Sequence, residues 1–270
     1  TGTNCQSGHP FVPTGPDGEA VADSYEYLTK PLTGNGSITV QVASLRGLVS
    51  TNPVNVAPSL SATRPGLAGW AKAGLLVTSS ARQGSPYAAV MATASDGIRF
   101  QYNYTHDRAG LPGAVSSTSA RWVRLTRTGD TVTGYDSTDG TSWHTIDAAR
   151  LSGLPATVDV GLFVTSPMSF QDGTGHQTRA TGTFSHIALA GGVSGAWQSR
   201  SIGMSQADFY PTLGVGSMHR SAQRFVVTGS GDIAPAVVQG LRGTDTAAST
   251  LLLGLTVGLI VLIVIATMFI

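Results

Sequence analysis

The sequence predicts an all-β sandwich of two antiparallel sheets, followed by one C-terminal transmembrane helix. Three observations predict it. Short segments before residue 190 alternate apolar and polar side chains at a period of two, which is the period of a strand rather than of a helix. Turn formers separate these segments, and the chain holds 34 glycines and 13 prolines. The final twenty residues contain no charged side chain.

The first strands are expected where that alternation begins. Residues 38–42 read ITVQV, which places three β-branched side chains on one face. Residues 87–94 and 98–104 form a predicted hairpin closed by Asp96-Gly97, because this dipeptide favours the positive φ angles of tight turns.

The later predicted strands are short segments bounded by turn residues: 121–127, 131–137, 142–146, 158–166 and 181–190. The first two form a hairpin around Gly129, and Asp139-Gly140 closes the turn that leads to the third. With the earlier segments they make about nine or ten short strands, and such a series is typical of a β-sandwich.

The segment 246–270 is the predicted transmembrane helix. Its last twenty residues contain no charge, amide, proline or histidine, and twenty helical residues span about 30 Å, the thickness of a bilayer core. Thr250, Gly254 and Gly258 repeat at a spacing of four, which places three small residues on one face for close helix packing. Either a sibling helix of the same protein or a second copy in a homodimer is expected to meet that face.

Charge and cysteine content restrict the function. A net charge of +1 without any basic run argues against a nucleic-acid partner. The single cysteine, Cys5, forms no internal disulfide, and we interpret it as a free thiol.

The stretch from Trp122 to Trp143 resembles the concanavalin-like jelly-roll domains that occur beside secreted bacterial glycosidases and on bacterial surface proteins. It contains WVRLTRTG, VTGY and STDG, and WAKAGLLV from Trp70 fits an earlier strand of that family. The resemblance covers about residues 20–192 and implies two curved antiparallel sheets packed face to face. From the residues alone, the aromatic side chains of this stretch also fit core or hairpin packing.

A second resemblance lies nearer the C-terminus. FVVTGSGDIAP at residues 225–235, followed by a short Gly-rich linker and the apolar helix, resembles part of the actinobacterial ABC-transporter permeases of the exporter type. The resemblance implies a cell-membrane protein, truncated here at both ends, whose residues 1–245 are extracytoplasmic. It also implies a cytoplasmic ABC ATPase subunit as partner.

These patterns divide the chain into four segments. We expect an N-terminal lead-in at 1–22, the jelly-roll sandwich at 23–192, a small β/linker segment at 193–245 and the transmembrane helix at 246–270.

No catalytic motif is present in the sequence. Retaining glycosidases need two carboxyl groups about 5 Å apart, but the only glutamates are Glu19 and Glu26, both near the N-terminus. The six histidines lack zinc-site spacing, and no Gly-x-Ser-x-Gly occurs. We therefore expect no enzyme and no cofactor. Calcium is the one metal with candidate ligands, in the polar loops at 103–107 and 172–175.

Two functions stay open. The first is the outer domain and one helix of a transporter permease, non-catalytic and acting by ligand sensing or gating. The second is a membrane-tethered, lectin-like module that binds carbohydrate. If a ligand binds, Tyr102, Tyr104 and Trp143 are the candidate aromatic contacts by strand position, with core packing as the alternative for each.

Overall fold

The computed structural model describes residues 13–53, 61–113, 120–171, 173–203, 217–221 and 224–235. Every regular element in these ranges is a β-strand, so the predicted all-β class is confirmed. The strands are β1 (Val21–Asp23), β2 (Tyr25–Pro53), β3 (Thr63–Pro65), β4 (Lys72–Thr78), β5 (Tyr87–Thr93), β6 (Ile98–Tyr102), β7 (His106–Ala109), β8 (Arg121–Thr128), β9 (Thr131–Ser137), β10 (His144–Arg150), β11 (Thr157–Thr165), β12 (Ser169–Gln171), β13 (Thr174–Val193), β14 (Gln198–Ile202), β15 (Ser217–Ser221), β16 (Arg224–Gly229) and β17 (Ile233–Pro235).

The predicted transmembrane helix lies outside the described residues, together with Thr250, Gly254 and Gly258. Within the described ranges, no helix is long and apolar enough to cross a membrane.

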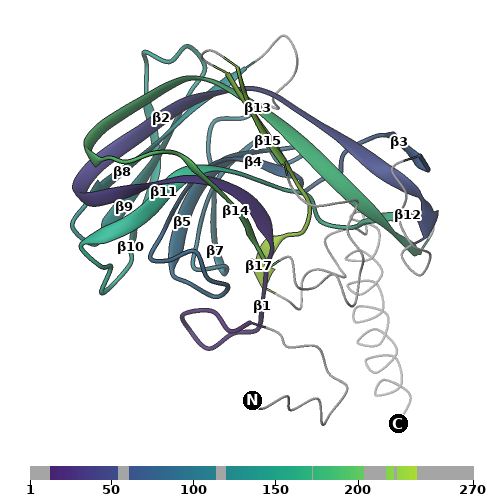
Figure 1. The fold of residues 1–270 in the computed structure, drawn as a ribbon, viewed down its shortest axis with the longest axis horizontal. Coiled ribbons are helices and arrows are strands. Elements are labelled where there is room, and N and C mark those ends of the chain that lie inside the picture. Colours follow the sequence, from purple (N-terminus) through teal and green to yellow (C-terminus); the bar gives the residue numbers. More distant parts are fainter. Residues whose placement is uncertain are drawn as a thin grey trace, which may run out of the picture.

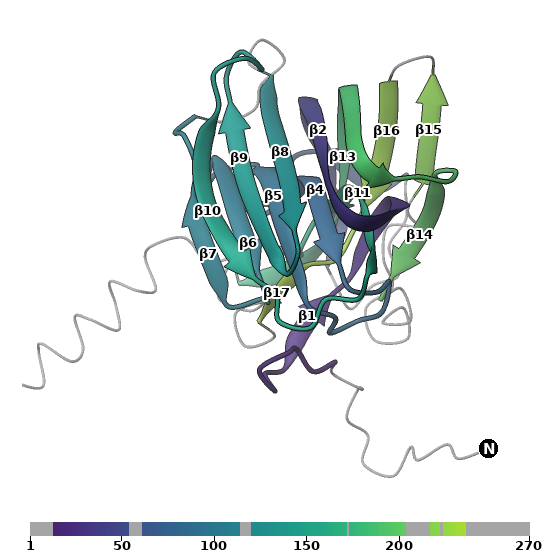
Figure 2. The same ribbon diagram turned by 90° about the vertical axis from the view of Figure 1, so that its left-hand side faces the viewer.

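The long strand β2 folds the chain into two layers, and Figures 1 and 2 show it curving back on itself. Its residues 26–33 pair with β11, whereas its residues 36–42 pair with β8. Gly34, between these stretches, has a φ of 68°. Gly36 begins the second stretch, and a Cβ on it would lie 2.6 Å from the carbonyl oxygen of Ala190. Glycine meets both conditions without a steric penalty, so these two residues permit the bend.

We name the two layers after their central strands. The β5 sheet contains β14, the first half of β2, β11, β4, β5, β6 and β7. The β8 sheet contains β10, β9, β8, the second half of β2, β13, β16 and β15. β13 runs antiparallel beside β2 and follows it around the bend, from His176 opposite Pro53 to Val193 opposite Leu32. The architecture is therefore a β-sandwich.

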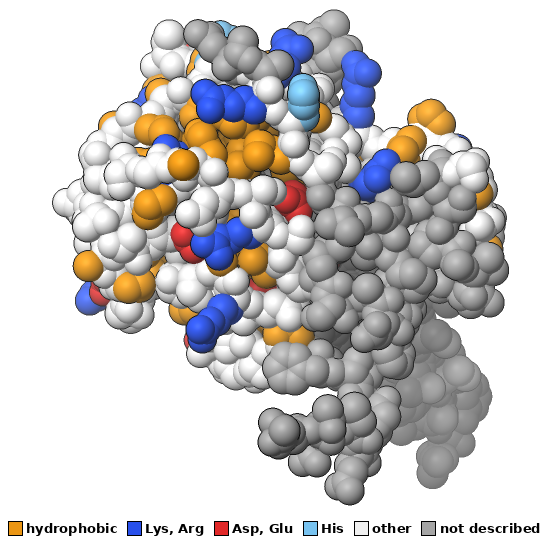
Figure 3. Space-filling model, viewed as in Figure 1, with side chains coloured by type: hydrophobic (Ala, Val, Ile, Leu, Met, Phe, Trp, Pro, Cys, Tyr) orange, Lys and Arg blue, Asp and Glu red, His pale blue; other side chains and the backbone are white. Residues whose placement is uncertain are grey.

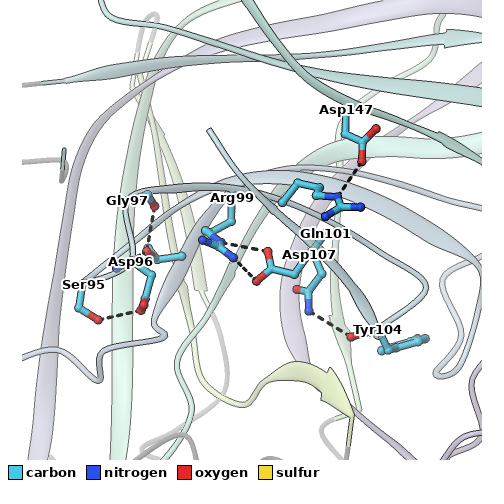
Figure 4. Close-up of polar contacts among 10 residues, drawn as sticks. Ser95, Asp96, Gly97, Arg99, Gln101, Tyr104, Asp107 and Asp147 are labelled. Atoms are coloured by element: carbon cyan, nitrogen blue, oxygen red, sulfur yellow. Dashed lines mark hydrogen bonds and ion pairs between the residues drawn. The ribbon is translucent and has the colours of Figure 1, made fainter. Parts of the chain in front are cut away.

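Side chains from alternate strand positions fill the space between the sheets. In β8, buried Val123 and Leu125 alternate with half-exposed Trp122 and Arg124. We call the buried set the inter-sheet core, and its members include Leu28, Ile38, Leu75, Val90, Phe100, Val123, Leu125, Val160, Leu162, Phe184 and Val227. At one edge, Arg108 on β7 and Asp147 on β10 form an exposed ion pair at 3.4 Å between the two sheets (Figure 4).

The opposite face of the β5 sheet is also buried. All seven positions of β4 and of β5 are buried, which explains why neither strand alternates with polar residues. We call the residues on this face the tyrosine cluster: Val21, Tyr25, Tyr27, Leu76, Tyr87, Ala89, Met91, Tyr104, Phe163, Ile202 and Ile233. The two-stranded pairing of β1 with β17 supplies the first and the last of them.

A fully buried ion pair joins β4 to the segment just before β17. Lys72 Nζ lies 2.5 Å from Asp232 Oδ1 and donates to the carbonyl oxygen of Ile233 at 2.7 Å. Both charged side chains have no exposed surface. The residues after 192, predicted as a small β/linker segment, thus contribute strands to the β8 sheet and one partner of this pair.

A candidate ligand-binding face on the β8 sheet

The outward side of the β8 sheet carries a group of aromatic side chains. Trp122 and Arg124 occupy the outward positions of β8, and Tyr135 lies opposite Arg124 on the neighbouring β9. Trp143 directly precedes β10, and the ring of exposed His186 lies 5.2 Å from the ring of Trp122. We call these five residues the aromatic face.

Arg124 is fixed at the centre of this face by two contacts. Its guanidinium lies 3.8 Å from the centre of the Trp143 ring, which is a cation–π contact. Its Nε donates a hydrogen bond to Thr39 Oγ1 on β2 at 2.9 Å. The guanidinium is therefore held in one orientation, and its other N–H groups are able to donate to a ligand.

The turn between β9 and β10 positions both tryptophans. The carboxylate of Asp139 accepts hydrogen bonds from the backbone N–H groups of Ser142 and Thr141 at 2.8 and 2.7 Å, and these bonds hold its pKa below the usual range. Gly140 has a φ of 77°, and a Cβ there would lie 2.7 Å from the Trp122 ring. The turn predicted from Asp139-Gly140 is confirmed, and it packs against Trp122.

Tyr102 and Tyr104 do not lie beside Trp143. Tyr102 is half-buried on β6 and stacks on His106, with ring centres 4.3 Å apart. Tyr104 is only 1% exposed, so its expected surface position is corrected. The physical reason is local: Asn103 and Tyr104 have φ angles of 43° and 62°, which end the strand alternation after Tyr102.

The Tyr104 hydroxyl meets a buried carboxyl group in the tyrosine cluster. It donates to Asp23 Oδ2 at 2.6 Å, and the Gly84 N–H donates to the same oxygen at 2.7 Å. Burial raises the pKa of Asp23 to about 6, and the two hydrogen bonds oppose that rise only in part. Burial and the Asp23 charge also raise the pKa of Tyr104. Gln101 Nε2 donates to the Tyr104 carbonyl oxygen at 3.3 Å (Figure 4).

The polar loop at 103–107, a candidate for calcium, has its oxygens engaged by the protein. Asp107 accepts two hydrogen bonds from Arg99, at 3.0 and 2.6 Å (Figure 4). Asn103 Oδ1 accepts from the backbone N–H of Tyr87. Across the described ranges, no three His, Cys, Asp or Glu side chains group together as metal ligands would. In the other candidate loop, Asp172 lies outside those ranges.

Other carboxylates also have protein partners. Glu26 belongs to β2 and is buried, where its two oxygens accept hydrogen bonds from Ser199 and Ser201 at 2.6 and 2.5 Å. Asp136 lies 2.9 Å from His144 Nδ1.

A pocket of about 500 Å³ lies between β15, β16, Lys30 of β2 and the segment that precedes β14. Trp197, Met218 and Phe225 line it, and Figure 3 shows hydrophobic side chains beside Lys and Arg side chains on the side of the molecule that carries β14 and β15. Lys30 lies over the Trp197 ring and donates to the Gly195 carbonyl oxygen.

Sequence reasoning gave Trp143 as a candidate contact, with packing as the alternative, and interpreted Trp122 and Tyr135 as packing residues. A signal for both was present. Trp122 stands in the phase of β8 opposite to Val123, and Tyr135 stands in the phase of β9 opposite to Val132. Aromatic residues in the polar phase of a half-buried strand indicate a surface aromatic group.

No family model matches the chain, and no curated protein matches it. Three solved structures illustrate the similarity that does occur. A mutant of the GH43 protein BlXynB from Bacillus licheniformis is 14% identical over 58% of this chain and 27% of that chain, with a TM-score of 0.34. Scytalido-glutamic peptidase with a transition state analog inhibitor is 7% identical over 76% and 98%, with a TM-score of 0.40. Lectin I-B4 from Griffonia simplicifolia is 12% identical over 70% and 86%, with a TM-score of 0.33. At such TM-scores, none of these similarities bears on function.

Proposed function

We propose that the chain is a non-catalytic glycan-binding module whose ligand lies on the aromatic face. The observation that carries the proposal is the half-exposed Trp143 ring, held 3.8 Å from the Arg124 guanidinium on the outward side of the β8 sheet. Arg124 lies on strand β8 and holds the Trp143 ring in place, and a preorganised site binds at a lower entropic cost.

The side chains of the aromatic face match the two kinds of surface on a sugar ring. The C–H groups of a pyranose face are apolar and pack on an indole or phenol ring, whereas the hydroxyl groups at its edge accept hydrogen bonds. Trp122, Tyr135 and Trp143 offer the rings, and Arg124 offers N–H donors between them. Aromatic side chains with a few fixed polar groups are the usual composition of a small-ligand site.

We propose that the two sheets have the concanavalin-like arrangement. We also propose that the module does not hydrolyse its ligand. Retaining or inverting hydrolysis needs a carboxylic acid and a second carboxylate on opposite sides of one bond. The oxygens of Glu26 are bound by two serines, and the carboxylate of Asp139 caps a turn. Both carboxylates therefore have structural partners that account for their positions.

We also propose that the apolar segment 246–270 holds the module at a lipid bilayer, with residues 1–245 extracytoplasmic. This part of the proposal depends on the sequence pattern alone. No observation on the described residues favours the permease role or an ATPase partner over a simple membrane tether.

Affinity electrophoresis tests the binding site. The full chain, in an uncharged detergent, would migrate through gels containing soluble plant and bacterial polysaccharides. We expect Trp143→Ala to weaken retardation about tenfold, which corresponds to about 1.4 kcal/mol. Tyr102→Ala is the control, because it removes a half-buried ring from the other sheet, and it should bind as the wild type does.

Cooperative melting of each variant checks that it is folded. A Trp143→Ala protein that melts normally and binds normally would remove the aromatic face as the site. Free migration of the wild type through every polysaccharide would overturn the proposed function.

A further inference from the structure

We infer that the ligand is an acidic polysaccharide that continues from the aromatic face into an arginine-lined groove on the same sheet. This inference rests on the proposed function and adds the chemical class of the glycan.

The groove has a volume of about 650 Å³ and lies over β2, β13 and β16. Arg46, Thr181, Thr183 and Arg224 line it. Arg46 lies opposite Thr181, and both are in the outward phase, because their neighbours Leu45 and Gly182 face the inter-sheet core. The groove therefore opens on the same side of the β8 sheet as the aromatic face.

One row of residues connects the two regions. Gln41 lies opposite both Trp122 and Ser185, and Ser185 lies opposite Arg224, so the row crosses from β8 to β16. Three strand spacings of about 4.8 Å make this path roughly 14 Å long, the length of a short oligosaccharide rather than of one sugar. Ser185 Oγ donates to Gln41 Oε1 at 2.9 Å and so orders the polar middle of the row.

The path is positively charged. The outward positions of the described strands β8, β9, β13, β16 and the second half of β2 contain Arg46, Arg124, Arg179 and Arg224 but neither Asp nor Glu. Arg46 and Arg224 are exposed, and neither takes part in an ion pair between described residues. A neutral glycan needs no such charge, whereas an acidic one pairs with it.

Arginine also selects the kind of anion. Its planar guanidinium presents parallel N–H groups that match the two oxygens of a carboxylate or a sulfate. In one bound polysaccharide, a uronic acid or a sulfated sugar would lie in the groove. The face of another sugar ring would stack on Trp122 or Trp143, so the ligand would contact both regions. Carboxylate and sulfate share this chemistry, so the test includes both.

The test compares matched polymers that differ only in charge. Polygalacturonate is set against its methyl ester, and dextran sulfate against dextran, with binding to the full chain in uncharged detergent measured by calorimetry. We expect at least one charged polymer to bind about tenfold more tightly than its neutral partner at low salt, with an advantage that shrinks as salt rises.

Arg46→Gln/Arg224→Gln should remove most of that advantage and leave the neutral polymer's affinity unchanged. Arg82→Gln/Arg200→Gln removes the same two charges from exposed positions of the other sheet and is the matched control. Equal affinity for the charged and neutral members of both pairs, or an undiminished advantage in Arg46→Gln/Arg224→Gln, overturns the acidic-glycan inference and leaves the proposed function standing. Absence of binding to all four polymers and to the polysaccharides of the electrophoresis test overturns both.

Discussion

The inter-sheet core and the tyrosine cluster lie on opposite faces of the same β5 sheet but differ in chemistry. The inter-sheet core is apolar and comes from alternate positions of strands that neighbour one another in a sheet. The tyrosine cluster holds four tyrosines, and buried Asp23, Lys72 and Asp232 lie in or beside the strands that form it. The tyrosine cluster thus combines its apolar contacts with a buried ion pair and a buried carboxyl group whose pKa is raised.

Breaking the buried ion pair should produce the largest effect. Lys72→Met leaves the Asp232 carboxylate buried without its partner, and we expect a loss of about 3–5 kcal/mol in the free energy of unfolding. Urea denaturation of the full chain measures it. The double variant Lys72→Met/Asp232→Leu should recover most of the loss, because two apolar side chains need no partner. A double variant as unstable as Lys72→Met would show that packing, rather than the unpaired charge, causes the loss.

The second-largest effect should be a pH dependence of stability that comes from the tyrosine-cluster face and not from the inter-sheet core. The pKa of Asp23 is about 6 in the folded chain and 3.8 for the free group. Between these values the folded state holds more protons than the unfolded state, so stability falls as pH rises from about 4 to about 6. The full difference corresponds to roughly 3 kcal/mol.

Asp23→Asn should flatten that pH profile, because the amide does not titrate in this range. Denaturant midpoints at half-unit pH intervals provide the measurement. Asp139→Asn, on an exposed turn of the other sheet, is the control and should leave the decline between pH 4 and 6 in place. An unchanged decline in Asp23→Asn would assign it to another group.

A small cavity in the inter-sheet core should produce the smallest effect. Ile38→Val removes one buried methylene group from β2, and we expect a loss of about 1 kcal/mol. The same loss should be measured at pH 4 and at pH 7, because no titratable group takes part. A loss that differed strongly between the two pH values would mean that the two faces of the β5 sheet are coupled.

The local features were predictable from the sequence. The hairpin at Asp96-Gly97 and the hairpin around Gly129 occur at the expected positions, since period-two alternation and turn chemistry act over a few residues. The alternation of Val123 and Leu125 with Trp122 and Arg124 likewise showed which side of β8 faces the core.

Features that join distant segments were not predictable in the same way. Nothing near Lys72 indicates that Asp232 will neutralise it, because their meeting depends on the path of the whole chain. The strand predicted at 38–42 is part of the much longer β2, whose bend depends on the close approach of Ala190 to Gly36. Tyr104 was misplaced because two successive positive φ angles reverse a side chain without any glycine to signal it.

The pairing of β1 with β17 has a consequence for how this fold can be used. Val21 lies opposite Pro235 and Asp23 opposite Ile233, so the chain enters and leaves the sandwich at the same place. A domain with adjoining entry and exit points can be inserted into a surface loop of another protein without separating the two ends of that loop. It can also be circularly permuted, with a short linker across residues 21 and 235 and new ends at the exposed turn residue Gly129. Modular transfer between unrelated host proteins is thus compatible with this fold.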